Sequence, residues 1–153
     1  MRENNGYLPR KHQFLGNDAN FDANGLFQCE LSSNTNDHDE ALFLTIFKNE
    51  TTINLHMSLT SPVELPTPLP EAIAIAIGEH ALEPFRGGFG VGLMPDSRRL
   101  TVYKVISLAN KPQSYVQNTF QQLLEKIEQW HLFIEQTDNE EAIPEQLPAG
   151  IFI

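Results

Sequence analysis

Apolar and polar side chains alternate in three segments of the first half of the chain, at residues 26–31, 41–48 and 52–59. The third segment alternates most regularly, and its apolar face consists of Ile53, Leu55, Met57 and Leu59. A period of two residues is typical of a strand with one face on a core and the other in water. We therefore predict three strands, which begin after the turn sequence DANG at residues 22–25.

The second of these segments, ALFLTIFK, is apolar on both faces. Leu42, Leu44 and Ile46 lie on one face, whereas Phe43 and Phe47 lie on the other. Only one face of a strand packs against the core of a two-layer domain. The apolar second face therefore needs to be covered by another part of the chain or by a binding partner.

The stretch EAIAIAIGEHAL looks at first like another strand, because isoleucine occupies alternate positions at 73, 75 and 77. A helical arrangement sorts the side chains further, as far as Phe85, with the charged residues on one side together with Ala72 and Ala76. The alanine-rich composition favours a helix. This stretch is preceded by SPVELPTPLP, whose four prolines are expected to stop regular structure and to leave Pro70 at a first helical position. We predict a helix over residues 71–85.

The apolar arc of this helix spans roughly 200°, about twice the width that one sheet face requires. Its centre is made of small residues, which would let another helix approach closely. We therefore expect a homodimer, with an interface that includes Ile73, Ala74, Ile75, Gly78, Leu82 and Phe85. The alternative is that the chain's own N-terminal arm or C-terminal tail covers this arc.

Two further strands, at residues 88–94 and 100–108, flank the turn Pro95-Asp96-Ser97 and predict a β-hairpin. A second helix follows at residues 114–136, because apolar residues recur there at spacings of three and four. Its apolar face consists of Val116, Phe120, Leu123, Ile127, Trp130 and Ile134. The expected organisation is an arm at residues 1–25, loose or partly docked, a single α+β domain at residues 26–135 and an acidic tail at residues 136–153.

The amino-acid composition limits the classes of partner that the protein is expected to bind. The chain has 153 residues, of which 41% are hydrophobic and 20% charged, as expected for one soluble domain. Its formal net charge of −10 disfavours nucleic acid and anionic lipid and favours a basic or amphipathic protein segment. No apolar run reaches the roughly 20 residues of a membrane span, and the N-terminus lacks the apolar core of a signal peptide. We expect a cytosolic location without membrane insertion, which agrees with the single cysteine, Cys29.

Candidate chemistry is sparse. The run GGFGVG enters a predicted strand, whereas a phosphate-binding loop would lead into a helix, so we expect its glycines to serve bending or close approach of backbones. The five histidines show no metal-ligand spacing, and NDHDE at residues 36–40 is the only local cluster of candidate ligands, which we interpret as a solvated loop. We expect no catalytic residue, no metal and no cofactor, and assign Cys29 to the sheet.

The order of these elements resembles that of the class I type III secretion chaperones of Gram-negative bacteria. Four segments carry the resemblance, which extends from about residue 22 to residue 135: GLFQCEL after an acidic turn, LPEAIAIAIGEHAL, GGFGVGLMPDSRRLTV and FQQLLEKIEQWHLFI. Two features depart from the family pattern. The sequence of residues 1–21 does not show the pattern of the usual amphipathic helix, and Met94-Pro95 displaces the acidic or amide residue that commonly follows the first strand of the hairpin.

The resemblance implies a homodimeric α+β protein with a twisted antiparallel sheet of about five strands and helices packed on it. It also implies a cytoplasmic bacterial chaperone that binds the non-globular N-terminal segment of a secreted effector or regulatory protein without ATP hydrolysis.

Independently of the family, an extended partner segment could add to a sheet edge. We predict partner contacts at Leu26, Phe43, Phe47 and Tyr103, because the opposite faces of their strands serve the core. A register error of one residue would invert this set. The alternative function is a regulatory or sensory α+β module that binds a folded partner or a ligand without any role in secretion.

Overall fold

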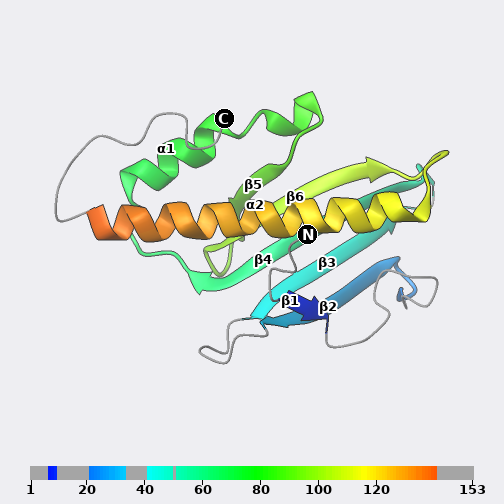
Figure 1. The fold of residues 1–153 in the computed structure, drawn as a ribbon, viewed down its shortest axis with the longest axis horizontal. Coiled ribbons are helices and arrows are strands. Elements are labelled where there is room, and N and C mark those ends of the chain that lie inside the picture. Colours follow the sequence, from blue (N-terminus) through cyan, green and yellow to red (C-terminus); the bar gives the residue numbers. More distant parts are fainter. Residues whose placement is uncertain (1–6, 10–20, 34–40, 50, 141–153) are drawn as a thin grey trace.

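The residues that the structure describes form one antiparallel sheet, two helices and a short 3-10 turn (Figure 1). This computed structural model describes residues 7–9, 21–33, 41–49 and 51–140. The strands are β1 (Tyr7–Pro9), β2 (Leu26–Ser33), β3 (Ala41–Asn49), β4 (Asn54–Glu64), β5 (Gly90–Leu93) and β6 (Arg99–Ser107). The helical elements are α1 (Glu71–Glu79), the 3-10 turn η1 (Glu83–Arg86) and α2 (Gln113–Glu140).

The six strands lie in the order β1-β2-β3-β4-β6-β5, and all neighbours are antiparallel. The expected fold class, an α+β domain with helices packed on an antiparallel sheet, is confirmed. Five of the strands are those that the sequence pattern predicts. The sixth, β1, comes from within residues 1–25 and pairs with β2.

The DANG turn folds as its side chains dictate. The Asp22 carboxylate accepts hydrogen bonds from the main-chain N–H groups of Asn24 (2.8 Å) and Leu26 (3.0 Å). Gly25 has φ +80°, and a Cβ there would collide with the carbonyl oxygen of Lys48. Glycine is therefore required for β2 to begin beside β3.

Helix α2 runs across one face of the sheet, against β4 and β6 (Figure 1). Its buried side chains repeat at helical spacing and comprise Thr119, Phe120, Leu123, Leu124, Ile127, Trp130, Phe133 and Thr137. They meet the inward side chains of the strands, among which Leu42, Leu44 and Ile46 of β3 are almost completely buried. The two predicted faces of β3 are thus confirmed, and Phe43 and Phe47 lie on the side away from the core.

The first helix is shorter than the sequence pattern predicts. It ends at Glu79, and the chain continues through a turn into η1. Pro84 explains the difference, since a proline inside a helix lacks the N–H group and clashes with the carbonyl four residues earlier, here that of His80. Tighter bonds take over, from the Glu83 N–H to the His80 carbonyl (3.2 Å) and from the Phe85 N–H to the Leu82 carbonyl (3.1 Å).

Strand β4 is longer than predicted and runs through Pro62 to Glu64. Its register against β6 shifts between Thr60 and Glu64, and its pairing with β3 extends only to Thr60. A proline is tolerated in a strand at such an irregularity because no regular ladder bond is lost there. At its other end Ile53, which was expected on the apolar face, has φ 58° and lies outside the strand.

Candidate partner-binding surfaces

The sheet face opposite α2 presents side chains from four strands, and we call it the open face. Cross-strand pairing brings the following residues onto it: Leu26, Gln28, Glu30, Phe43, Thr45, Phe47, His56, Ser58, Thr60, Thr101, Tyr103 and Val105. Among the described helices, α2 packs on the opposite face. The open face is therefore the side on which the sequence predicted partner contacts.

All four predicted partner-binding residues lie on the open face. Phe43, Phe47 and Tyr103 are 39%, 38% and 38% exposed, and Leu26 is half-buried. Val105, 46% exposed, belongs to the same surface and was not predicted, although its place two residues after Tyr103 indicates the shared face.

One cross-strand row holds much of this apolar surface. Leu26 pairs with Phe47, Phe47 with His56, and His56 with Val105. The Phe47 and His56 rings lie 5.7 Å apart at a tilted angle. The neighbouring row, formed by Gln28, Thr45, Ser58 and Tyr103, is polar except for the tyrosine. The apolar surface thus runs across the strands, next to a polar row.

Tyr103 also has a role within the protein. It pairs with Gly90 of β5, and a Cβ at Gly90 would collide with the tyrosine ring. The glycine of GGFGVG thus admits an aromatic ring onto the backbone of β5. This geometry agrees with the interpretation of these glycines as sites of close approach.

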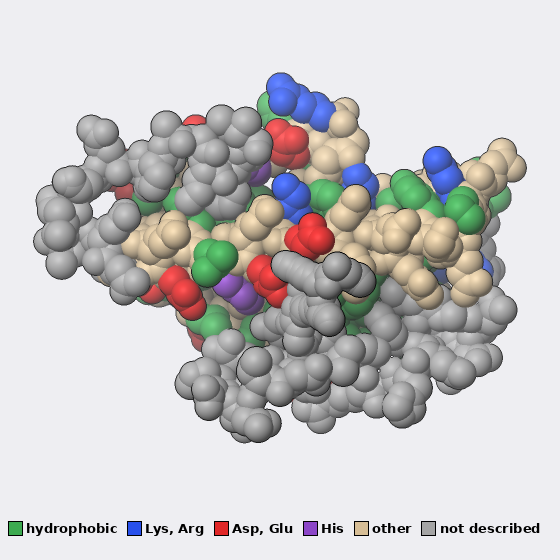
Figure 2. Space-filling view, in the orientation of Figure 1, with side chains coloured by type: hydrophobic (Ala, Val, Ile, Leu, Met, Phe, Trp, Pro, Cys, Tyr) green, Lys and Arg blue, Asp and Glu red, His purple; other side chains and the backbone are tan. Residues whose placement is uncertain are grey.

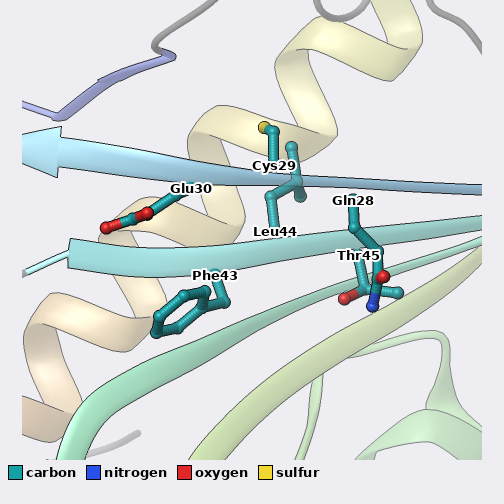
Figure 3. A pocket seen from close by; sticks show the side chains of 6 residues that line it. All are labelled: Gln28, Cys29, Glu30, Phe43, Leu44 and Thr45. Atoms are coloured by element: carbon teal, nitrogen blue, oxygen red, sulfur yellow. The ribbon is translucent and has the colours of Figure 1, made fainter.

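A shallow hollow of about 280 Å³ lies along β2 and β3, lined by Gln28, Cys29, Glu30, Phe43, Leu44 and Thr45. Figure 3 shows Phe43, Thr45 and Gln28 on one side of these strands, and Cys29 and Leu44 on the side of the helix. Small-molecule pockets usually measure roughly 300–1,000 Å³ and enclose their ligand. This hollow is better suited to a side chain of a bound protein segment.

The second candidate surface lies on α1 and η1, and we call it the helix patch: Ala74, Ile75, Gly78, Ala81, Leu82 and Phe85. Ile75, Leu82 and Phe85 are 46%, 66% and 88% exposed. No atom lies within 4 Å of the position where a Cβ on Gly78 would be. Five of the six residues predicted for a dimer interface, Ala74, Ile75, Gly78, Leu82 and Phe85, are therefore exposed.

Ile73, the sixth predicted interface residue, is misassigned. Its exposed fraction is 0%, and it belongs to the core cluster. The helix turns Ile73, Ala76, Ile77 and His80 toward the interior, at the spacing i, i+3, i+4, i+7. The His80 ring meets the Trp130 ring edge-on at 5.5 Å, which fixes this orientation against α2.

Figure 2 shows the side of the molecule on which α2 lies. Acidic side chains are scattered along the helix among uncharged polar ones, and basic side chains lie mainly above it. Lys104 and Lys126 both approach the Phe89 ring, at 4.7 and 6.0 Å from its centroid, and Lys104 donates a hydrogen bond to the Gly87 carbonyl. These cations hold the segment before β5 against β6 and α2.

The described residues show structural contacts at two histidines outside the open face. His131 forms a 2.9 Å hydrogen bond with the buried Ser61 hydroxyl, and the His80 ring donates to the Ala76 carbonyl at 2.9 Å. Within the described ranges, no group of three or more His, Cys, Asp or Glu side chains could hold a metal ion. The cluster NDHDE at residues 36–40 lies outside the described residues. None of the described helices is long and apolar enough to cross a membrane.

Comparison with known proteins gives a match at the level of the fold. No protein-family model and no curated protein sequence matches the chain. One chain of the solved HopA1–SchA chaperone–effector complex superimposes with a TM-score of 0.51 at 22% sequence identity. The match covers 72% of this chain and 78% of the other. The protein thus shares its fold with a chain of a chaperone–effector complex.

Proposed function

We propose that this protein is a cytosolic type III secretion chaperone, which binds the non-globular N-terminal segment of a secreted effector or regulatory protein and keeps it competent for export. It acts by binding alone, without ATP hydrolysis. The observation that carries the proposal is the open face, where Phe43, Phe47, Tyr103 and Val105 are exposed on the back of a sheet whose other face forms the core. The fold match with a chain of a chaperone–effector complex supports it.

Physical chemistry favours an extended or partly helical protein segment as the ligand. The apolar side chains of the open face are spread over β2, β3 and β6, and the hollow along β2 and β3 is shallow. A long segment contacts such a spread surface better than a compact ligand does. The net charge of −10 favours a basic segment, because attraction between opposite charges speeds association. Repulsion between like charges disfavours acidic partners.

The proposal includes a homodimer formed through the helix patch. Phe85 and Leu82 are more exposed than any other large hydrophobic residues of the described ranges. Gly78 and its alanine neighbours leave room for a second helix to approach. Burial of such apolar area stabilises association by about 25 cal/mol per Å² before the costs of ordering are subtracted.

Co-expression tests the proposal. N-terminal segments of secreted proteins from the native host, each insoluble when expressed alone, are expressed with and without this chain. A chaperone keeps its own segment soluble and co-purifies with it, without added nucleotide. If every such segment stays insoluble and none co-purifies, the proposed function is wrong.

A further inference from the structure

Lys104 lies on the core side of β6, at a position where an apolar side chain is expected. Val102 and Ile106, two residues away on the same face, are 1% and 3% exposed, and the cross-strand partner Met57 is 1% exposed. Lysine is rarely placed among such neighbours, because its ammonium group loses water there. The half-buried side chain instead extends outward and donates a hydrogen bond to the Gly87 carbonyl. Core packing thus gives no reason for a positive charge at this position.

A second ammonium group lies beside the same aromatic ring as that of Lys104. The Nζ atoms of Lys104 and Lys126 are 4.7 and 6.0 Å from the centroid of the Phe89 ring. Two like charges at one ring repel each other, and a single cation would be enough to hold the ring. The two lysines come from different layers, β6 and α2, so the fold itself brings these charges together.

Neither lysine has a carboxylate partner among the described residues. Helix α2 is rich in glutamate, but the neighbours of Lys126 at spacings of three and four residues are uncharged: Gln122, Leu123, Gln129 and Trp130. Lys104 pairs across the sheet with the apolar Met57. The charges of both lysines are therefore left for a group outside the chain.

Arg86 adds a third positive charge, three residues before Phe89 in the chain. Its side chain is 78% exposed, and its 3.7 Å ion pair with Glu83 is of the surface type that contributes little. We call Arg86, Lys104 and Lys126 the cation cluster. Figure 2 shows basic side chains gathered above α2 on this side of the molecule. In a protein of net charge −10, this cluster is a local exception.

We propose that the cation cluster is the docking site of a short acidic segment of a second protein partner. Glutamate or aspartate side chains of this segment pair with Lys104 and Lys126 through charge-assisted hydrogen bonds. The inference goes beyond the proposed function, which assigns the secreted segment to the open face. The cation cluster lies on the helix side of the sheet, so the two partners can be bound at the same time.

The charge of the whole molecule selects among anionic partners. A nucleic acid or an anionic bilayer is a long or wide array of phosphates, which would extend beyond three cations and meet the surface of a protein with net charge −10. A short acidic segment contacts the cluster alone. The half-buried Phe89 ring between the lysines offers apolar surface to the methylene groups of glutamate.

Fluorescence anisotropy with the full chain tests the site. The probe is a labelled eight-residue peptide in which glutamate alternates with serine. A matched peptide has glutamine in place of each glutamate, and a labelled single-stranded oligonucleotide of eight nucleotides represents a phosphate ligand. The protein variants are Lys104→Met, Lys126→Met and the control Lys111→Met. Lys111 lies 5.0 Å from the centroid of the Tyr115 ring, so the control removes the same charge from a lysine–aromatic contact outside the cluster.

Lys104→Met and Lys126→Met are each expected to weaken binding of the glutamate peptide about tenfold, because each removes one ion pair. Methionine is unbranched and apolar, so it fits the core-side position of Lys104, and emission of the buried Trp130 verifies the fold. Lys104→Arg should restore the affinity to within about threefold, since it keeps the charge. Lys111→Met should stay within about twofold, and the glutamine peptide should bind at least about tenfold more weakly.

Four results would overturn the inference. Absence of saturable binding of the glutamate peptide up to about 1 mM would exclude the site. Equal affinity of the two cluster variants and the unaltered chain would place the peptide elsewhere, and so would loss of binding when Phe43 and Phe47 are both replaced by serine. Tighter binding of the oligonucleotide than of the peptide would contradict the class of partner. None of these results affects the proposed function, which depends on solubilisation of a secreted segment.

Discussion

The ring of Tyr103 lies against the backbone of Gly90, across the pair formed by β5 and β6. The ring occupies the space that a Cβ atom on residue 90 would need, so a side chain at this position would collide with the ring. Gly92, two residues further on the same strand, has no atom within 4 Å of its Cβ position. The two glycines of one short strand thus differ in what they do.

Gly90→Ala is expected to destabilise the protein by about 1–3 kcal/mol, because the new methyl group displaces the Tyr103 ring or separates the strands. Gly92→Ala is the matched control and should change stability by less than about 0.5 kcal/mol. Urea unfolding, followed by the emission of Trp130, measures both. Equal stability of the two variants would mean that the Tyr103 ring moves aside without loss.

Ile73→Ala is expected to lower the free energy of unfolding by about 2–5 kcal/mol, since it leaves a cavity in the core between α1 and α2. Ile75 lies two residues further along α1 but is 46% exposed, so Ile75→Ala should have a much smaller effect on the stability of the monomer. The same unfolding experiment at low protein concentration compares them. A larger loss of stability in Ile75→Ala than in Ile73→Ala would mean that the orientation assigned to α1 is wrong.

Gly78→Glu is expected to weaken the proposed dimer, because it introduces a charge into the helix patch while the monomer has room for the side chain. Phe85→Ser should act similarly through lost apolar contact, and each should raise the dimer dissociation constant at least about tenfold. Analytical ultracentrifugation measures the mass. Leu132→Ser removes a 57% exposed hydrophobic residue of α2, outside the patch, and serves as control. Dimers that persist in both patch variants would place the interface elsewhere.

Replacement of Phe43 and Phe47 by serine is expected to weaken binding of a co-purified secreted segment by about 10–100-fold, while the fold persists because both rings lie outside the core. Isothermal titration with the purified segment measures the affinity. Ile53→Ser, at a 52% exposed position outside the open face, should leave affinity within about twofold. Unchanged affinity in the double variant would exclude the open face as the binding surface.

Much of the open face followed from the alternation in β2, β3, β4 and β6, because the period of two assigns each side chain to a face once one face is known to be buried. Phe43, Phe47 and Tyr103 were placed on this basis. Val105 obeys the same rule and could have been included. That α1 stops short of Phe85 was also available from the sequence, since Pro84 disfavours a regular helix beyond the residue before it.

The sequence by itself determined the order of β2 to β6 and the two helices, the two faces of the sheet and the helical nature of EAIAIAIGEHAL, because hydrophobic period, proline and glycine act locally. Only the tertiary structure decided which stripe of α1 is buried. Isoleucine occurs at 73, 75 and 77, and the contact of His80 with Trp130 selects Ile73 and leaves Ile75 outside. The pairing of β1 with β2 and the fit of Tyr103 over Gly90 were likewise undetermined, since both depend on residues far apart in the chain that meet only after the sheet has formed.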